Sequence, residues 1–289
     1  MSRPRGMLLV AGAATVWSSG GLIARLVDTD AWTTTFWRGL CAAAFLIVVI
    51  AVTRRQGPLA QWRAIGLPGA AVALCLATAS TCFILALTRT SVANTLILMS
   101  VGPWVAGLLG WFVLGERVRP RTWTTMGLAL AGVAIMVSAS HGTSRLAGDA
   151  LAILMATVFA VGTVLMRRHP EIQMAPAAGL GAALTCVIGL ALGSPGSASA
   201  RDVALLAFFG AGQLGVGFLM FTAGARLIPV AESSLIGMLE TVLGPFWVWL
   251  FLGETIGVRT VVGGAVILAA LVAHTLLDVR ATVRASRRS

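Results

Sequence analysis

The chain alternates between long apolar stretches and short polar ones from end to end. A bilayer has a hydrocarbon core about 30 Å thick, and an α-helix needs about 20 residues to cross it. Ten apolar segments are long enough, and they cover residues 7–26, 32–53, 65–87, 91–114, 122–139, 148–166, 175–192, 203–224, 230–252 and 258–277. The pattern therefore predicts an all-α integral membrane protein with ten transmembrane helices.

Two parts of this pattern are copies of each other. Residues 92–116 and 230–254 align without a gap at an offset of 138 and share Val-Ala at the start and Leu-Gly-Glu at the end. The stretch AATVWSSG at 13–20 recurs as MATVFAVG at 155–162, so we interpret the first segment as a retained helix and not as a signal peptide. The repeat unit is therefore five helices.

An odd number of helices per repeat means that the second copy enters the membrane with the opposite orientation. Transporters are often built from two such inverted repeats, with the binding site near mid-membrane between them. We predict a first five-helix repeat at 1–139, a linker loop at 140–147, a second, inverted repeat at 148–279 and a basic cytoplasmic tail at 280–289.

The arginines between the segments give the orientation. The chain contains no lysine. Fifteen arginines fall on one side of the predicted helices and five on the other, and basic residues accumulate in cytoplasmic loops. This asymmetry predicts that both termini are cytoplasmic in a multi-pass protein of a prokaryotic cytoplasmic (inner) membrane.

Composition narrows the classes of protein. With 58% hydrophobic and 11% charged residues, the chain has too few polar residues for an ordinary soluble surface. The net charge of +11 lies in loop arginines that set topology, so we expect no nucleic-acid partner. The four cysteines lie within apolar segments without the spacing of metal ligands, and we expect no metal or cofactor.

Several motifs together resemble the EamA-type proteins of the drug/metabolite transporter superfamily. They are the Trp-bearing opening helix at 13–20, Phe36-Trp37-Arg38 in the second helix, the two Leu-Gly-Glu helix ends, and Pro120-Arg121 followed by GLALAGV at 127–133. The resemblance covers essentially the whole chain. The chain departs from the family where Thr241 follows Glu240, since the family often has Glu-Pro there, and where the second Leu-Gly-Glu lacks a following arginine.

The resemblance implies a secondary transporter whose central cavity is lined mainly by helices 1, 3, 4, 6, 8 and 9. It also implies a small-molecule substrate, often an exported amino acid, with aromatic or neutral amino acids as the leading candidates. The same fold could instead export drug-like or cationic compounds, or take up metabolites. We expect a monomer in the lipid bilayer.

Glu240 is the main candidate for substrate binding, because a carboxylate in the middle of an apolar run is costly unless it faces protein or water. On a continuous helix, Ser233, Glu240, Gly244 and Trp247 would share one face, and this stripe could bind an amine. Glu240 could also carry a proton, which makes the proton a candidate coupling ion. The alternative is a protonated glutamic acid hydrogen-bonded between helices.

Other polar and aromatic residues at mid-membrane depth are weaker candidates. Trp17 and Ser18 could form a cavity wall or simply pack, and Gln213 must hydrogen-bond either a substrate or a neighbouring helix. Asn94 and Glu232 could gate the two mouths or serve as helix-start polar groups. The candidate substrate-binding residues are Trp17, Ser18, Thr78, Thr81, Asn94, Met99, Gln213, Ser233, Glu240 and Trp247.

Three further features have both a functional and a structural interpretation. Arg38 could reach inward toward a carboxylate or extend to the outer interface. Pro103 and Pro245 interrupt helices 4 and 9 and could be hinges or static kinks. Glu116 and Glu254, at helix ends, are expected to be structural.

An enzyme embedded in the membrane is the competing class of function. Catalysis needs clustered histidines and carboxylates, or a nucleophile beside a base. His141, His169 and His274 are instead far apart in the sequence, and we predict that the protein is not an enzyme.

Overall fold

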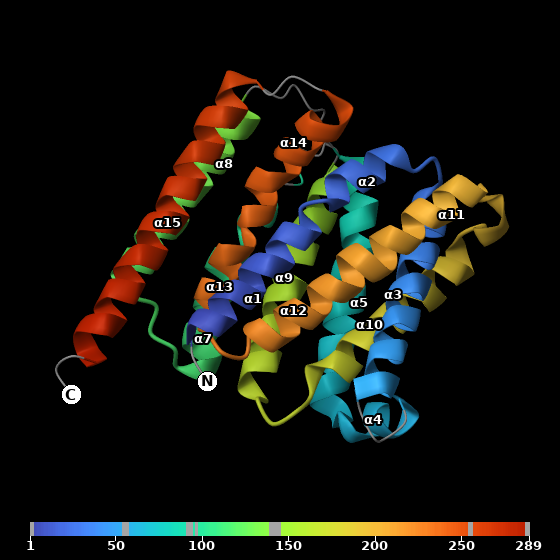
Figure 1. Cartoon of the computed structure of the whole chain (residues 1–289), viewed down its shortest axis with the longest axis horizontal. Helices are drawn as coiled ribbons and strands as arrows, with labels where there is room; N and C mark the ends of the chain where they lie inside the picture. The colour runs from blue at the N-terminus through green and yellow to red at the C-terminus, as the bar shows by residue number, and fades with distance from the viewer. Residues whose placement is uncertain are drawn as a thin grey trace.

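The structure is a computed structural model, and it describes residues 3–53, 58–90, 95, 98–138, 146–253 and 257–286. All regular secondary structure within these ranges is helical (Figure 1). The first repeat contains α1 (Arg3–Trp17), α2 (Gly20–Leu26), α3 (Ala31–Thr53), α4 (Pro58–Ala64), α5 (Gly66–Arg89), α7 (Gly102–Leu114) and α8 (Pro120–Val137).

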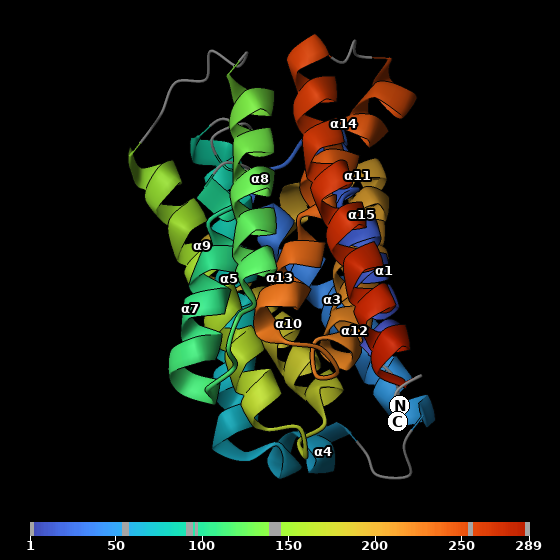
Figure 2. The same cartoon turned by 90° about the vertical axis from the view of Figure 1, so that its left-hand side faces the viewer.

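The second repeat contains α9 (Leu146–Arg168), α10 (Met174–Leu192), η1 (Pro195–Ser197), α11 (Ala200–Ala207), η2 (Phe208–Gly215), α12 (Val216–Gly224), α13 (Val230–Gly237), α14 (Leu239–Leu252) and α15 (Val258–Ser286). The start of α1, the short helix α4 and the end of α15 lie on one side of the molecule, which we call the terminal face (Figures 1 and 2). The side with α2 and the end of α14 is the opposite face.

The helices have the length and composition of membrane spans. Within the described residues, eight helical stretches are long and apolar enough to cross a bilayer, and Gly102–Leu114 is a shorter apolar helix. Large apolar side chains such as Leu67, Phe112 and Val258 are exposed on the outside of the bundle, which suits a surface in contact with lipid. The predicted all-α membrane fold is confirmed.

Equivalent helices of the two repeats run antiparallel. Helices α3 and α10 approach so closely that a Cβ at Gly39 would clash with the backbone at Cys186, and one at Gly189 would clash with the backbone at Phe36. Early residues of α3 therefore face late residues of α10. Small residues permit such close helix contacts in membranes, where packing replaces the hydrophobic effect.

The same relation holds for α8 and α15, which lie side by side at one edge of the bundle (Figure 1). At one end the Nη1 of Arg259 donates to the backbone oxygen of Ser138 at 2.9 Å. At the other end Thr125 and His274 are 3.4 Å apart. The start of each helix thus meets the end of its counterpart, so the two repeats have opposite orientations.

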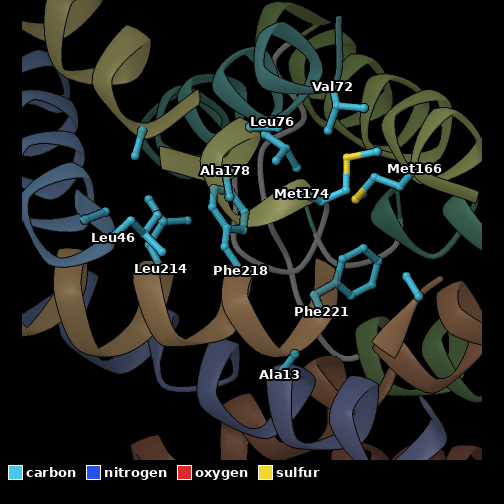
Figure 3. Packing of buried hydrophobic residues seen from close by; sticks show 14 of the residues in the cluster. Ala13, Leu46, Val72, Leu76, Met166, Met174, Ala178, Leu214, Phe218 and Phe221 are labelled. Carbon is cyan, nitrogen blue, oxygen red and sulfur yellow. The ribbon is translucent and has the colours of Figure 1, made fainter. Parts of the chain in front are cut away.

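Most of the remaining packing is between repeats. Helix α5 packs on α9, and its counterpart α12 packs on α1; α7 of the first repeat packs on α13 of the second. Figure 3 shows the resulting core, where Leu76 from α5, Met166 from α9, Met174 from α10 and Phe221 from α12 meet. Neither repeat has a core of its own at this position.

Several helices differ from the continuous segments predicted. A short helix, α4, lies in the predicted loop between segments two and three. Helix 1 breaks after Trp17, where the Ser18 and Ser19 hydroxyls donate to Thr15 and Val16 backbone oxygens. Hydroxyls that bond the preceding turn compete with the helical pattern. The eighth predicted segment, 203–224, contains a π-helical stretch, η2, which includes Gln213.

Helix 9 also differs from the sequence prediction. The ninth predicted segment, 230–252, consists of α13 and α14, with a break at Met238 between them. Pro245 lies inside α14. The other break, in the fourth predicted segment (91–114), comes directly before Gly102 and Pro103 at the start of α7. The prediction that Pro245 interrupts helix 9 is therefore wrong, and a proline is not the shared cause. Met238 and Ser100 occupy equivalent positions at the repeat offset of 138, so the break belongs to the repeat.

Candidate functional site

A cavity of about 130 Å³ lies at the interface of the two repeats. Since about 10–15 Å³ of such volume is enough to hold one water, the cavity has room for several waters or a small molecule. Its lining includes five aromatic side chains, Trp17, Phe83, Phe159, Phe218 and Phe221. Its polar lining residues are Arg38, Ser80, Ser100, Gln213, Ser233, Ser234, Glu240 and Thr241.

Both broken helices contribute their break points to the cavity. Ser100, Gly102 and Pro103 come from the fourth predicted segment (91–114). Met238 and Glu240 come from the ninth (230–252). Irregular backbone at membrane depth is tolerated where it is buried in protein or lines a water-filled space. The breaks also place the first turns of α7 and α14 at the cavity, so the positive ends of these helix dipoles lie there.

Arg38 on α3 is held inside the protein. Its side chain is only 3% exposed, and its Nη1 and Nη2 donate to Ser80 Oγ at 2.8 Å and to Gln213 Oε1 at 3.0 Å. The guanidinium carbon lies 4.5 Å from the ring centre of Phe209 and 5.6 Å from that of Phe83. A buried cation needs such partners. Arg38 therefore points inward and does not extend to the interface.

Gln213 connects three helices at this point. Besides accepting from Arg38, it donates through Nε2 to the backbone oxygen of Trp17 at 2.9 Å. Its position in the π-helical stretch η2 turns the side chain toward α1 and α3. Insertion of one residue into a helix is often found at functional sites. Both the oxygen and the nitrogen of the amide are thus bonded to protein.

Glu240 is the opposite charge on the cavity wall. It lies in the first turn of α14, where the helix dipole favours an anion, and it is half-buried. Among the described residues it has no hydrogen bond or ion pair in reach, and Arg38 supplies the nearby positive charge. Its carboxylate is therefore available to a molecule in the cavity.

The aromatic residues form one continuous wall. The Trp17 indole lies 5.2 Å from Phe221 and 5.7 Å from Phe159, centre to centre, and these two phenylalanines are 4.9 Å apart. A Cβ on Gly217 would overlap the indole nitrogen of Trp17, so this glycine makes room for the ring. The wall presents ring surface to the cavity.

The predicted site residues separate into three groups. Trp17, Met99, Gln213, Ser233 and Glu240 line the cavity. Asn94 lies outside the described residues. The others are described but do not line the cavity, and they are Ser18, Thr78, Thr81 and Trp247.

The residues outside the cavity have local explanations. Trp247 donates from Nε1 to Ser18 Oγ at 2.7 Å, so these two side chains join α14 to helix 1. The predicted stripe of Ser233, Glu240, Gly244 and Trp247 assumed a continuous helix, and the break at Met238 divides it.

The predicted set lacked five of the polar cavity residues, which are Arg38, Ser80, Ser100, Ser234 and Thr241. For Arg38, depth in the membrane does not distinguish an inward side chain from one at the interface. The presence of a second polar residue at membrane depth, Gln213, is the sequence feature that indicates a partner for a buried Arg38. The pairing of residues so far apart required the fold.

On the terminal face, Glu116 joins three helices. Its Oε1 accepts from Arg167 Nε on α9 at 2.9 Å, and its Oε2 accepts from the backbone N–H of Val230 at the start of α13 at 3.1 Å. Gly115, with φ of +67°, ends α7 in the left-handed conformation and directs the chain into this contact. We call this arrangement the Glu116 clasp. It supports the structural role predicted for Glu116.

Glu232, predicted as a gate or helix-start residue, also lies on this face. Its carboxylate pairs with Arg3 at the start of α1, and its side chain is almost wholly buried. The ion pair joins helix 1 to helix 9. The ion pair and the Glu116 clasp thus both join the two repeats on the terminal face.

Comparison with known proteins supports this architecture. The model of the EamA-like transporter family matches the chain twice, at residues 4–138 and 146–276. A solved structure described as "Crystal structure of protein" has 20% identity and a TM-score of 0.80, with 96% of this chain and 99% of that one covered. No curated protein matches the chain.

The structural match at this identity establishes the fold, and the double family match covers nearly the whole chain. Members of the family are membrane transporters of small substrates and not enzymes. The chain belongs to the EamA-like transporter family.

Proposed function

We propose that the protein is a secondary transporter that exports amino acids or related small metabolites across a prokaryotic cytoplasmic membrane. The observation that carries the proposal is the cavity between the repeats, lined by the break points of helices 4 and 9. Broken helices at mid-membrane depth are typical of substrate sites in transporters with inverted repeats. The export direction and the amino-acid class come from the family resemblance.

The mechanism we propose is alternating access, in which the two repeats rock against each other around the cavity. The Glu116 clasp and the Arg3–Glu232 ion pair would hold the terminal face closed in one state. The distribution of arginines favours a cytoplasmic location for that face. A proton bound by Glu240 is a candidate coupling ion.

Efflux of cationic compounds is the second candidate function. The accessible carboxylate of Glu240 and the aromatic wall beside it favour this class, because both attract cations. Uptake of metabolites by the same fold is a further alternative.

Counterflow in proteoliposomes tests the proposal. Purified protein would be reconstituted with unlabelled substrate inside and a labelled panel of aromatic, aliphatic and cationic compounds outside. We expect saturable exchange of at least one amino acid, abolished by Ala156→Trp, which fills the cavity from α9. Leu154→Trp, on the exposed side of the same helix, is the matched control and should retain exchange.

Two outcomes would count against the proposal. Exchange that does not saturate would indicate a channel, and exchange unaffected by Ala156→Trp would place the route elsewhere. Accumulation by inside-out rather than right-side-out membrane vesicles would distinguish export from uptake.

A further inference from the structure

The two charged residues of the cavity wall differ in what they can offer a ligand. The Arg38 guanidinium donates to Ser80 and Gln213 and is covered by the ring of Phe209, and only 3% of the residue is exposed. The Nε of Arg38 has no hydrogen-bond partner among the described residues, but this atom is fully buried. A substrate carboxylate would therefore have to compete with Ser80 and Gln213 for the Nη groups. Arg38 thus contributes a fixed positive charge and not an open binding group.

Glu240 is in the reverse situation. It has no hydrogen bond or ion pair to any described residue, and it lines the cavity with part of its surface exposed. Two neutral polar residues of helix 9, Ser234 and Thr241, line the same wall. A carboxylate can accept several hydrogen bonds, and here none is supplied by the residues that the structure describes. The missing partner is a hydrogen-bond donor, preferably a cationic one.

The aromatic wall has the same preference. Trp17, Phe159 and Phe221 are in mutual contact and line the cavity together with Glu240. Aromatic faces attract ammonium groups and accept apolar bodies. A substrate with an ammonium group and a hydrophobic body therefore matches both features. A substrate carboxylate matches neither and would be repelled by Glu240.

We propose that Glu240 binds the ammonium group of the substrate, and that Arg38 is a positioning residue that does not contact the substrate. The substrate class is amines with an aromatic or aliphatic body, and a carboxylate on the substrate is dispensable. Amino acids fit because of their amino group. Since the inference names the substrate of the proposed transport site, it rests on the proposed function.

A series of three compounds with one phenyl body tests the assignment. They are phenethylamine, which has only the amine, phenylalanine, which has both groups, and 3-phenylpropionate, which has only the carboxylate. Binding of labelled phenethylamine to full-length protein in lipid nanodiscs would be measured, with the other two as competitors. We expect phenylalanine to compete and 3-phenylpropionate to be at least about tenfold weaker than the amine.

Variants of the same protein separate binding from folding. Glu240→Gln should weaken phenethylamine binding about tenfold or more, and Glu240→Asp should restore part of the loss. Glu171→Gln, an exposed acid in a loop beside His169, is the control and should bind as the wild type does. Thermal unfolding of each variant shows whether it is folded, so that binding is compared between folded proteins.

The inference is overturned if 3-phenylpropionate competes as well as phenethylamine, if folded Glu240→Gln binds the amine normally, or if the wild type binds no amine. The proposed function is tested separately by counterflow. Glu240-dependent binding without exchange would uphold the inference and refute transport. Saturable exchange that is independent of Glu240 would uphold transport and refute the inference.

Discussion

Gly217 shows how one missing side chain shapes the cavity wall. A Cβ at this position would overlap the indole of Trp17, so we predict that Gly217→Ala displaces the ring and destabilises the protein by about 1–3 kcal/mol. Gly127→Ala is the matched control, because nothing lies within 4 Å of a Cβ at that helical glycine. It should leave stability unchanged or raise it. Thermal unfolding in detergent measures both, and equal effects would refute the packing argument.

The Arg38–Gln213 contact gives a second prediction at this scale. Gln213→Leu leaves the buried Nη2 of Arg38 without its acceptor, and the loss of a hydrogen bond to a buried charge should cost about 1.5–3 kcal/mol. The double variant with Arg38→Met removes the charge as well and should lose less than the sum of the two single variants. Additive losses in denaturant unfolding would mean that the two side chains do not interact.

Single residues were the hardest features to predict from the sequence. The position of Glu240 in an apolar run was enough to bring it to attention, and it does line the cavity. Trp247 was predicted to share a helix face with Glu240, and Ser18 to lie with Trp17 on the cavity wall, but these two side chains bond each other instead. Hydropathy gives the depth of a residue in the membrane. It does not give the direction in which the side chain points once a helix has been broken.

At the scale of elements, the Glu116 clasp connects α7, α9 and α13. Arg167 and Glu116 are partly exposed, so solvent weakens the attraction between their charges. The hydrogen bond from the Val230 N–H to Glu116 adds to the stability of the clasp. We predict that Glu116→Gln opens the terminal face more often. In a cysteine-free background, a cysteine at Ala160 on the cavity wall should then react with maleimide about fivefold faster or more, as expected for a loss of about 1 kcal/mol.

The control for this labelling experiment is Glu171→Gln, since Glu171 pairs with His169 and is not part of the clasp. It should leave the labelling rate unchanged. An unchanged rate in Glu116→Gln would show that the clasp does not keep the face closed.

The positions of the helices followed from the sequence, but their interruptions did not. All described spans fall within the predicted apolar segments or close to their ends. The breaks at Ser100 and Met238 and the π-helical stretch around Gln213 lie inside strongly apolar runs. Such interruptions are maintained by contacts with other helices, so a local pattern carries no sign of them.

At the scale of the molecule, the two repeats share one core. Since α3 packs on α10 and α5 packs on α9, we predict that residues 1–139 alone will not form a stable protein. Coexpressed with residues 140–289 as a separate chain, they should copurify as a complex. Isolation of the 1–139 chain as a monodisperse species with the thermal stability of the whole protein would contradict this.

The global arrangement was the most predictable level. The offset of 138 residues and an odd number of helices per repeat already required the inversion, and the antiparallel pairing of α3 with α10 agrees with it. Which helices pair across the repeats was beyond the sequence. The contact between α3 and α10 depends on small residues such as Gly39 and Gly189, which hydropathy does not distinguish from other apolar positions.

The Arg38–Gln213 bond also has a consequence for biosynthesis. The two residues are 175 positions apart in the chain. Helix α3, which carries Arg38, is therefore made long before η2, which carries Gln213. At about 5–20 residues per second, roughly 10–35 s pass before Gln213 is available. Ser80, only 42 positions from Arg38, can reach the guanidinium first. The order in which the ribosome delivers the two partners therefore gives the chain a provisional anchor for its buried charge before the final one arrives.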